Sequence, residues 1–256
     1  MGFRFSFPIP VSIKDYTEPG PYLAISEPCL FVQAEAQDEF AIENATGKPL
    51  PEHHHLAIFK MLRKSLSLDR AYKFKLSCSL PELLANEGDL FPMAVIMSAY
   101  HIQHKRFNRP MREEVLNLLF SEGLITNKAF CLTSSIGGIL FSSPDLPYVQ
   151  LRLPKGIHAC LDTGAVPFPT QGATTHRLLL LQKACLLTIP NLLQDALSAD
   201  PRIMNSRHPA YLGTLPTSSG HLHFFENKAA LDRVLEAEGM HQAHQVALNL
   251  NGFEKS

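Results

Sequence analysis

The sequence contains little that points to a charged partner, a membrane or an oxidising compartment. It has 23 lysine and arginine residues against 24 acidic ones, so the formal net charge is −1. A chain with this balance has no global field that would attract nucleic acid or an anionic membrane surface. No apolar run approaches the roughly 20 residues that span a bilayer. We therefore expect neither a nucleic-acid nor a membrane partner.

Cysteines are few, odd in number and widely spaced: Cys29, Cys78, Cys131, Cys160 and Cys185. No pair of them has the spacing of a zinc site or a redox motif, which favours reduced residues in a core. The first eleven residues alternate phenylalanine with other residues, as a strand does, and lack the apolar centre of a signal peptide. These features predict a cytoplasmic protein.

What the sequence does contain is typical of a globular protein. Apolar residues make up 45% and charged residues 18% of the 256 positions, enough for one large domain or two closely associated lobes. Strand and helix patterns are mixed along the chain, which favours an α/β or α+β fold. The patterns predict strands at residues 3–12, 22–26, 29–34, 72–80, 136–141, 157–161, 221–225 and 246–250. They predict helices at residues 55–66, 93–102, 112–120, 174–186, 190–197 and 228–238.

Five short segments combine small, polar and turn-forming residues beside strand or helix patterns. Residues 10–15 read PVSIKD at the end of a strand pattern and are followed by PG at 19–20 and LAI at 23–25. Residues 133–139 read TSSIGGI at the start of another strand pattern. Residues 80–81 (LP) end a strand pattern and precede the apolar run of a helix. Residues 162–164 (DTG) end a further strand pattern, and residues 216–220 (PTSSG) precede one.

In their order and spacing these segments resemble the motifs of the galacto-, homoserine, mevalonate and phosphomevalonate (GHMP) kinase superfamily. The segment after residue 81 stands where the family has a glycine- and serine-rich loop, whose backbone N–H groups and following helix hold nucleotide phosphates. The resemblance implies a two-lobed fold with mixed sheets packed against helices and a split βαβ pattern in the C-terminal lobe. It implies lobes at residues 1–150 and 151–256.

The resemblance also implies an activity: ATP-dependent phosphoryl transfer to a small mevalonate- or homoserine-like molecule, or a related decarboxylation, with ATP and Mg²⁺ as cofactors. The residues at the matching positions imply catalytic roles for Asp15 and Asp162. They imply cofactor-binding roles for Asn86, Glu87, Gly88, Asp89, Ser134 and Ser135. They imply substrate-binding roles for Ser12, Lys14, Ser218, Ser219 and Gly220. No residue is assigned to a resident metal ion, and a homodimer is possible.

The sequence departs from the family pattern where phosphates would bind. Between residues 82 and 92 only Gly88 remains of the glycine-serine run, and Glu87 and Asp89 add negative charge beside it. Like charges repel a phosphate, although these two acids could instead hold Mg²⁺. No carboxylate lies between Glu122 and Gly137, where many family members carry an aspartate base. A non-catalytic protein that binds a ligand or a partner protein is therefore the alternative hypothesis.

Several other polar residues have a structural explanation that is simpler than the functional one. The Asp162 segment is explained by a local turn, and the three histidines at 53–55 by the polar start of a helix. His221 and His223 share one face of a strand, for which a half-exposed sheet is the simpler account. Basic residues are densest at 105–112, where a solvated helix end or a phosphate-bearing substrate would explain them.

Overall fold

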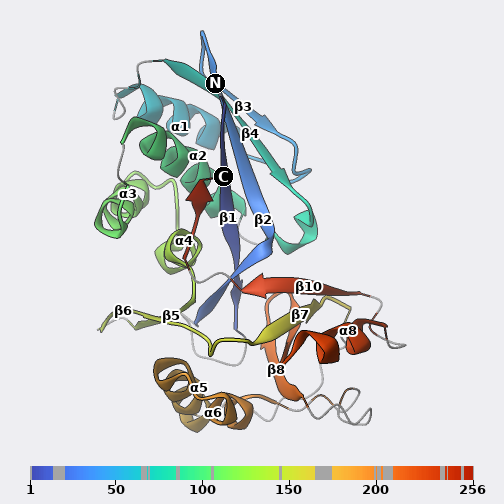
Figure 1. The fold of residues 1–256 in the computed structure, drawn as a ribbon. Coiled ribbons are helices and arrows are strands. Elements are labelled where there is room, and N and C mark those ends of the chain that lie inside the picture. The colour runs from blue at the N-terminus through green and yellow to red at the C-terminus, as the bar shows by residue number, and fades with distance from the viewer. Residues whose placement is uncertain are drawn as a thin grey trace. The chain divides into compact units, whose positions relative to one another are not determined.

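Strands and helices are mixed throughout the chain, so the structure, a computed structural model, confirms the predicted α+β class (Figure 1). None of the described helices combines the length and apolar character needed to cross a bilayer. The structure describes residues 2–13, 21–64, 68, 70–84, 87–104, 107–143, 146–164, 175–198, 200, 203, 210–236, 240, 242–248 and 251–255.

Two compact units make up the chain, and each is assembled from segments that interleave in sequence. The first unit consists of Met1–Pro10, Pro28–Gly137 and Asn251–Ser256. The second consists of Val11–Glu27 and Gly138–Leu250. Strands β1 (Gly2–Ser12) and β2 (Tyr22–Gln37) contribute residues to both units. The division into contiguous lobes at residue 150 stays a prediction.

The sheet of the first unit has the strand order β11-β1-β2-β4-β3. Strand β4 (Ala71–Cys78) lies antiparallel to β2, and β3 (Ala41–Asn44) lies parallel to β4. The short β11 (Glu254–Lys255) pairs with β1. Successive strand residues point to opposite faces, and the alternation predicted in β1 buries Phe5 and Phe7 on one of them.

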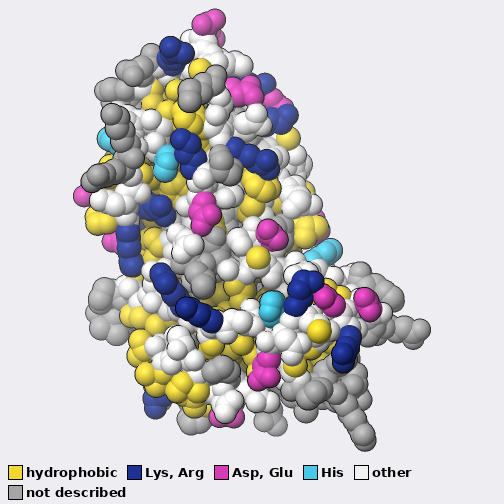
Figure 2. Space-filling model, in the orientation of Figure 1, with side chains coloured by type: hydrophobic (Ala, Val, Ile, Leu, Met, Phe, Trp, Pro, Cys, Tyr) yellow, Lys and Arg dark blue, Asp and Glu magenta, His cyan; other side chains and the backbone are white. Residues whose placement is uncertain are grey.

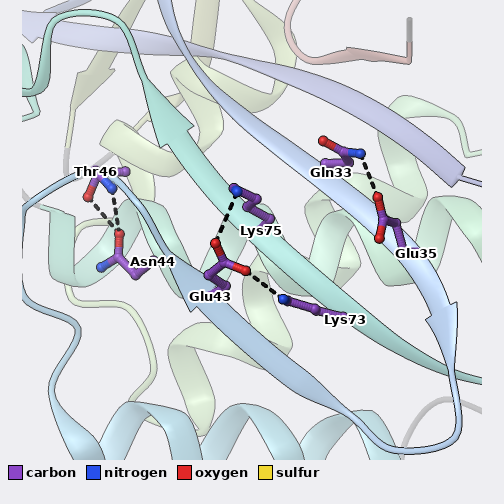
Figure 3. A network of polar contacts seen from close by, with 7 residues as sticks. All are labelled: Gln33, Glu35, Glu43, Asn44, Thr46, Lys73 and Lys75. Atoms are coloured by element: carbon purple, nitrogen blue, oxygen red, sulfur yellow. Dashed lines mark hydrogen bonds and ion pairs between the residues drawn. The ribbon is translucent and has the colours of Figure 1, made fainter.

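The outer polar residues of this sheet interact with one another (Figure 3). Glu43 on β3 forms ion pairs with Lys73 at 2.6 Å and with Lys75 at 3.0 Å, both on β4. Hydrogen bonds from these lysines lower the pKa of the Glu43 carboxyl. The three side chains are substantially exposed, so water screens the pairs and each contributes little to stability.

The described residues of the first unit form four α-helices: α1 (Glu52–Lys64), α2 (Glu87–Gln103), α3 (Arg109–Ser121) and α4 (Lys128–Ile136). Helix α2 begins six residues before the predicted start at 93 and includes Pro92 in its second turn. Its middle is apolar on every side and fully buried. The patterns did not predict α4, whose start is capped by the Asn127 side chain accepting the Phe130 N–H at 2.9 Å.

The second unit contains the strand order β8-β9-β7-β10, with every neighbouring pair antiparallel. The chain runs through β7 (His158–Asp162), helices α5 (Thr175–Leu187) and α6 (Pro190–Ala196), and then β8 (Tyr211–Thr217) and β9 (Gly220–Phe225). Helix α8 (Lys228–Glu236) and β10 (Ala243–Leu248) complete it. This is the predicted split βαβ pattern.

On the other side of β10 the sheet of the second unit continues into β2, β5 (Ile139–Ser143) and β6 (Leu146–Leu151). Strand β5 starts after Gly137 and Gly138, both with positive φ, so the predicted glycine turn is present. The strands predicted at 22–26 and 29–34 form the single strand β2. Strands β3, β6, β8 and β11 were not predicted.

Candidate functional site

The first candidate region is the start of α2, where the resemblance places nucleotide phosphates. Asp89 lies in the first turn of this helix with only 7% of its surface exposed. Its Oδ1 accepts the Thr126 N–H at 2.7 Å, and its Oδ2 accepts the Asn127 N–H at 2.8 Å. The Thr126 hydroxyl is a third donor, at 3.1 Å from Oδ2.

These bonds tie Asp89 to the start of another helix. The first N–H groups of a helix have no partner within it, and a negative charge near them is stabilising. Asp89 supplies that charge to the N-terminus of α4, together with the Asn127 cap. Both carboxylate oxygens are thereby engaged within the protein.

Apolar residues take the place of the family's glycines around Asp89. Leu83 ends a short 3₁₀ helix, and Leu83, Leu84 and Phe91 are all buried. Gly88, one of the residues predicted to bind the cofactor, lies next to His54: a Cβ built on Gly88 would be 3.8 Å from the His54 Cε1. Asn86 and the side chain of Glu87 lie outside the described residues. The described part of the loop does not fit ATP and Mg²⁺, because its buried carboxylate is engaged and its flanking side chains are bulky.

The two serines predicted to bind cofactor lie in α4, not in a loop. Ser134 and Ser135 are fully buried. The Ser134 hydroxyl donates to the Pro8 carbonyl at 2.7 Å, and the Ser135 carbonyl accepts from Arg112 Nη1 at 2.6 Å. Both residues therefore connect α4 to other segments of the first unit.

The basic cluster at 105–112 is partly explained by packing. The Arg112 guanidinium lies over the Phe253 ring, with Cζ 4.3 Å from its centroid, and burial lowers its pKa. Arg109 pairs with Glu113 at 2.8 Å. Lys105 and Arg106 lie outside the described residues.

The second candidate region, in the second unit, brings together residues from three distant segments. The Ser218 N–H donates to the Ser12 carbonyl at 2.8 Å, and the Ser12 N–H donates to the Ser218 hydroxyl at 3.3 Å. Gly220 has φ +136° and lies so close to the Asp162 carbonyl that a Cβ would overlap it. We call Ser12, Asp162, Ser218, Ser219 and Gly220 the hydroxyl cluster. The predicted residues Lys14 and Asp15 lie outside the described residues.

Asp162 itself forms the local turn that the sequence predicts. It ends β7, and its Oδ1 accepts the Gly164 N–H at 3.1 Å. The next residue, Thr163, donates from its backbone and its hydroxyl to the Gln242 carbonyl. Asp162 lies opposite His221 in the β7–β9 pairing, so the two side chains share a face of the sheet.

Beside this turn lies a buried chain of titratable groups that sequence reasoning missed. His223 and Asp200 are both inaccessible to solvent, with Nε2 and Oδ2 3.9 Å apart. The Tyr211 hydroxyl lies 3.5 Å from His223 Nδ1. The expected half-exposed face for His221 and His223 is therefore wrong. Apolar residues alternate with both histidines along β9, which is the pattern of a half-exposed strand, so the local sequence carried no signal for their burial.

Groups of three or more histidine, cysteine or carboxylate side chains that could hold a metal ion do not occur among the described residues. The three consecutive histidines fit the predicted polar helix start, because they lie in the first turns of α1. Burial, followed by the charge of His53, lowers the pKa of the His54 imidazole, while Asp89 opposes this shift.

No protein-family model and no curated protein sequence matches this chain. Several solved structures are similar over its whole length. Homoserine kinase from Cytophaga hutchinsonii has a TM-score of 0.63 at 14% identity, covering 100% of this chain and 97% of that one. Galactokinase from Lactococcus lactis, complexed with galactose, has a TM-score of 0.60 at 11% identity, with coverages of 100% and 95%. Mevalonate diphosphate decarboxylase from Staphylococcus aureus has a TM-score of 0.60 at 9% identity, with coverages of 100% and 98%.

These similarities extend across both units and include two kinases and a decarboxylase of the GHMP superfamily. The protein therefore has the GHMP kinase fold. At such low identities the likeness concerns the fold alone, and activity has to be argued from the residues themselves.

Proposed function

We propose that this GHMP-fold protein has lost the nucleotide-phosphate site of the kinases and serves as a ligand- or protein-binding module. The observation that carries the proposal is the engagement of Asp89. Its two carboxylate oxygens accept hydrogen bonds from Thr126 and Asn127, so they are committed to the start of α4. A side chain held in this way is not available to Mg²⁺.

Releasing Asp89 for a metal ion would be costly. It would leave the N–H groups of Thr126 and Asn127, which are partly shielded from water, without their acceptor, and each lost bond would cost up to about 1–3 kcal/mol. If Asp89 stayed in place, its charge would repel a nucleotide phosphate in the same loop. Both alternatives disfavour Mg²⁺–ATP at the start of α2.

The hydroxyl cluster supports a small polar molecule as the ligand. Ser218 is exposed and Ser12 and Ser219 are partly exposed, so their hydroxyl and backbone groups can reach a ligand from solvent. Asp162 lies behind them on the same unit. A small molecule with hydroxyl or amine groups, such as a sugar or a hydroxy amino acid, has the chemistry that fits this cluster.

A second candidate function is phosphotransferase activity, favoured by the full-length likeness to kinases. In this case ATP and Mg²⁺ would bind near Asn86, Glu87 and Gly88, and a mevalonate- or homoserine-like alcohol, or the substrate of a related decarboxylase, would bind at the hydroxyl cluster. Asp15 or Asp162 would then act as the base or the electrostatic stabiliser, since α4 begins with Lys128 and Ala129 where many relatives have an aspartate.

Thermal unfolding with ATP or ADP, each with and without Mg²⁺, separates the two functions. A ligand at about 100 times its Kd stabilises a protein by roughly 2.7 kcal/mol, which at about 2–4 °C per kcal/mol raises Tm by about 5–10 °C. We expect no rise in Tm with nucleotide. A Mg²⁺-dependent rise would overturn the proposed loss of the phosphate site and favour the phosphotransferase.

The same assay tests the hydroxyl cluster with galactose, homoserine and mevalonate as probes. A rise in Tm that is lost in Ser218→Ala but kept in Ser79→Ala, an exposed serine of the first unit, would place the ligand at the cluster. A rise that survives Ser218→Ala would place it elsewhere.

A further inference from the structure

A pocket of about 360 Å³ lies in the second unit, away from the hydroxyl cluster. It is formed by the loop at 153–157, the start of β7 and the last residues of β10. His158 begins β7 and Asp162 ends it, so at about 3.3 Å per residue about 13 Å of strand separates the pocket from the cluster. Pockets for small molecules measure about 300–1,000 Å³, and this one is therefore large enough for a small ligand.

Helix α8 covers only part of the sheet face that borders this pocket. Cys160 and Phe225 are buried on that face in a cluster with apolar residues of α8. Strand alternation places His158 and Gln245 on the same face, because His158 pairs with Phe225 and Gln245 with Cys160. His158 is only half-buried, and Gln245 is exposed. Their imidazole and amide groups can therefore form hydrogen bonds with a ligand.

Charges of both signs border the pocket. Lys155 lines it from the loop before β7. The register of β10 with β7 puts Ala247 opposite His158, and its register with β2 puts Ala247 opposite Glu27. His158, Ala247 and Glu27 thus form a row across three strands on one face, with Glu27 one strand beyond the lining residues. At about 4.8 Å per strand, the Cα atoms of His158 and Glu27 are about 10 Å apart.

Both charged side chains are available to a ligand. Lys155 and Glu27 are exposed, and neither forms an ion pair or a side-chain hydrogen bond within the described part of the chain. Figure 2 shows basic, acidic and histidine side chains interspersed over the part of the second unit that contains β7, β10 and α8. The small side chain of Ala247 leaves room between the imidazole of His158 and the carboxylate of Glu27.

We propose that this pocket binds a free amino acid with an apolar side chain. Lys155 and His158 hold the carboxylate of the ligand from one side, and Glu27 holds its ammonium group from the other. The apolar side chain of the ligand lies against Leu153 and Ile157, two apolar residues of the lining.

A ligand with a single kind of charge fits this pocket less well. A simple carboxylate would meet the negative charge of Glu27, and a simple amine would meet the positive charge of Lys155. Either end of a peptide offers only one of the two charges, whereas a free amino acid carries both on one carbon. The site depends neither on the proposed loss of the phosphate site nor on a ligand at the hydroxyl cluster.

Isothermal titration calorimetry of the full chain with L-leucine tests the proposal. We expect saturable binding of one leucine per chain. Lys155→Glu and Glu27→Lys should each raise its Kd about tenfold or more, because each replaces an attractive charge by a repulsive one. The matched controls are Lys183→Glu on α5 and Asp195→Lys on α6, which make the same charge changes at exposed positions of the same unit. They should leave the Kd within about twofold, since salt screens remote exposed charges. Circular dichroism and Tm verify that all four variants fold.

Two analogues of leucine test whether the pocket reads both charges. The compound 4-methylpentanoate lacks the ammonium group and leucinamide lacks the carboxylate, so each should bind about tenfold more weakly or worse. Equal affinity of leucine and either analogue overturns the proposal, as does the absence of saturation at about 10 mM leucine. Equal losses in the control variants overturn it too. Leucine binding that is lost in Ser218→Ala but kept in Lys155→Glu would assign the ligand to the hydroxyl cluster and overturn this site.

Discussion

Two buried aspartates, one in each unit, stand beside segments that resemble family motifs, and the protein uses them differently. Asp89 in the first unit accepts hydrogen bonds from residues 37 and 38 positions away. Asp162 in the second unit accepts one from Gly164, two positions away. The first carboxylate joins two helices, whereas the second closes its own turn. A motif position therefore does not define a role, because the role depends on which donors the fold brings to the carboxylate.

The largest expected effect comes from removing the long-range carboxylate. Asp89→Ala should lower the free energy of unfolding by about 3 kcal/mol, because two N–H groups and a hydroxyl lose a buried, charged acceptor from partly buried hydrogen bonds. Urea unfolding measures the change. The control is Asp232→Ala on α8, whose exposed pair with Lys228 should contribute less than about 0.5 kcal/mol. Equal losses in the two variants would show that Asp89 is not a structural anchor.

The next largest loss of stability is expected at the close contact between Gly220 and the Asp162 carbonyl. Gly220→Ala should cost about 2–3 kcal/mol, because the new Cβ would overlap the Asp162 carbonyl in addition to straining a backbone at φ +136°. Gly156→Ala is the control: its φ is +80°, but nothing lies within 4 Å of the added Cβ. Thermal unfolding should show a clearly smaller loss for Gly156→Ala. Equal losses would mean that Asp162 and Gly220 are not in close contact in solution.

The third prediction concerns the buried imidazole of His101 and the pH dependence of stability. Burial, and then the charges of Lys255 and Arg112, lower the pKa of the His101 imidazole below its usual 6.5. The unfolded chain therefore binds the proton more readily than the folded one. Stability should be full above about pH 6.5 and should decline as the pH falls through the lowered pKa.

Urea unfolding of the natural chain and of His101→Phe over this pH range measures that contribution. The ring of His101 lies among Phe5, Phe107 and Phe253, so phenylalanine suits the site. The variant should show a shallower decline at acidic pH. His54 and Glu43, whose pKa values are also lowered in the folded chain, remain in both proteins and contribute to the remaining slope. An unchanged slope would exclude His101 as a source.

The smallest effect should come from the hydroxyl cluster. Ser218→Ala removes the acceptor of the Ser12 N–H, but water can replace it at this exposed position. Stability should fall by no more than about 0.5 kcal/mol. A loss as large as that of Asp89→Ala in the same urea titration would mean that the cluster is a structural element and not a ligand surface.

Local patterns predicted many of the elements. Alternating apolar residues predicted β1 and β4, and helical spacing predicted α1 and α3. Helix α4 escaped prediction because its residues from Ala129 to Ile136 are buried on every side and therefore show no apolar periodicity. Its Asn127 cap was a signal in the sequence, but an asparagine in a loop is too common to identify a helix by itself.

The candidate site, too, was predicted in part from local patterns and in part could not be predicted from them. Segments 10–15, 162–164 and 216–220 could be selected from the sequence because turn residues next to strand patterns are locally readable. Their convergence could not be derived from spacing, since Ser12 and Ser218 are 206 positions apart. The burial of His223 was equally invisible, because Asp200 and Tyr211 reach it from other segments.

The sequence by itself determined the α+β class, many of the strands and helices and the order of the motif-like segments, because periodicity and turn chemistry act over a few neighbouring residues. Only the tertiary structure decided that Asp89 accepts hydrogen bonds from the start of α4, that two histidines of β9 lie in the core and that Leu179, Leu186 and Leu187 of α5 face solvent. Each of these depends on which distant segment supplies a donor or covers a face, and a single segment of sequence does not contain that information.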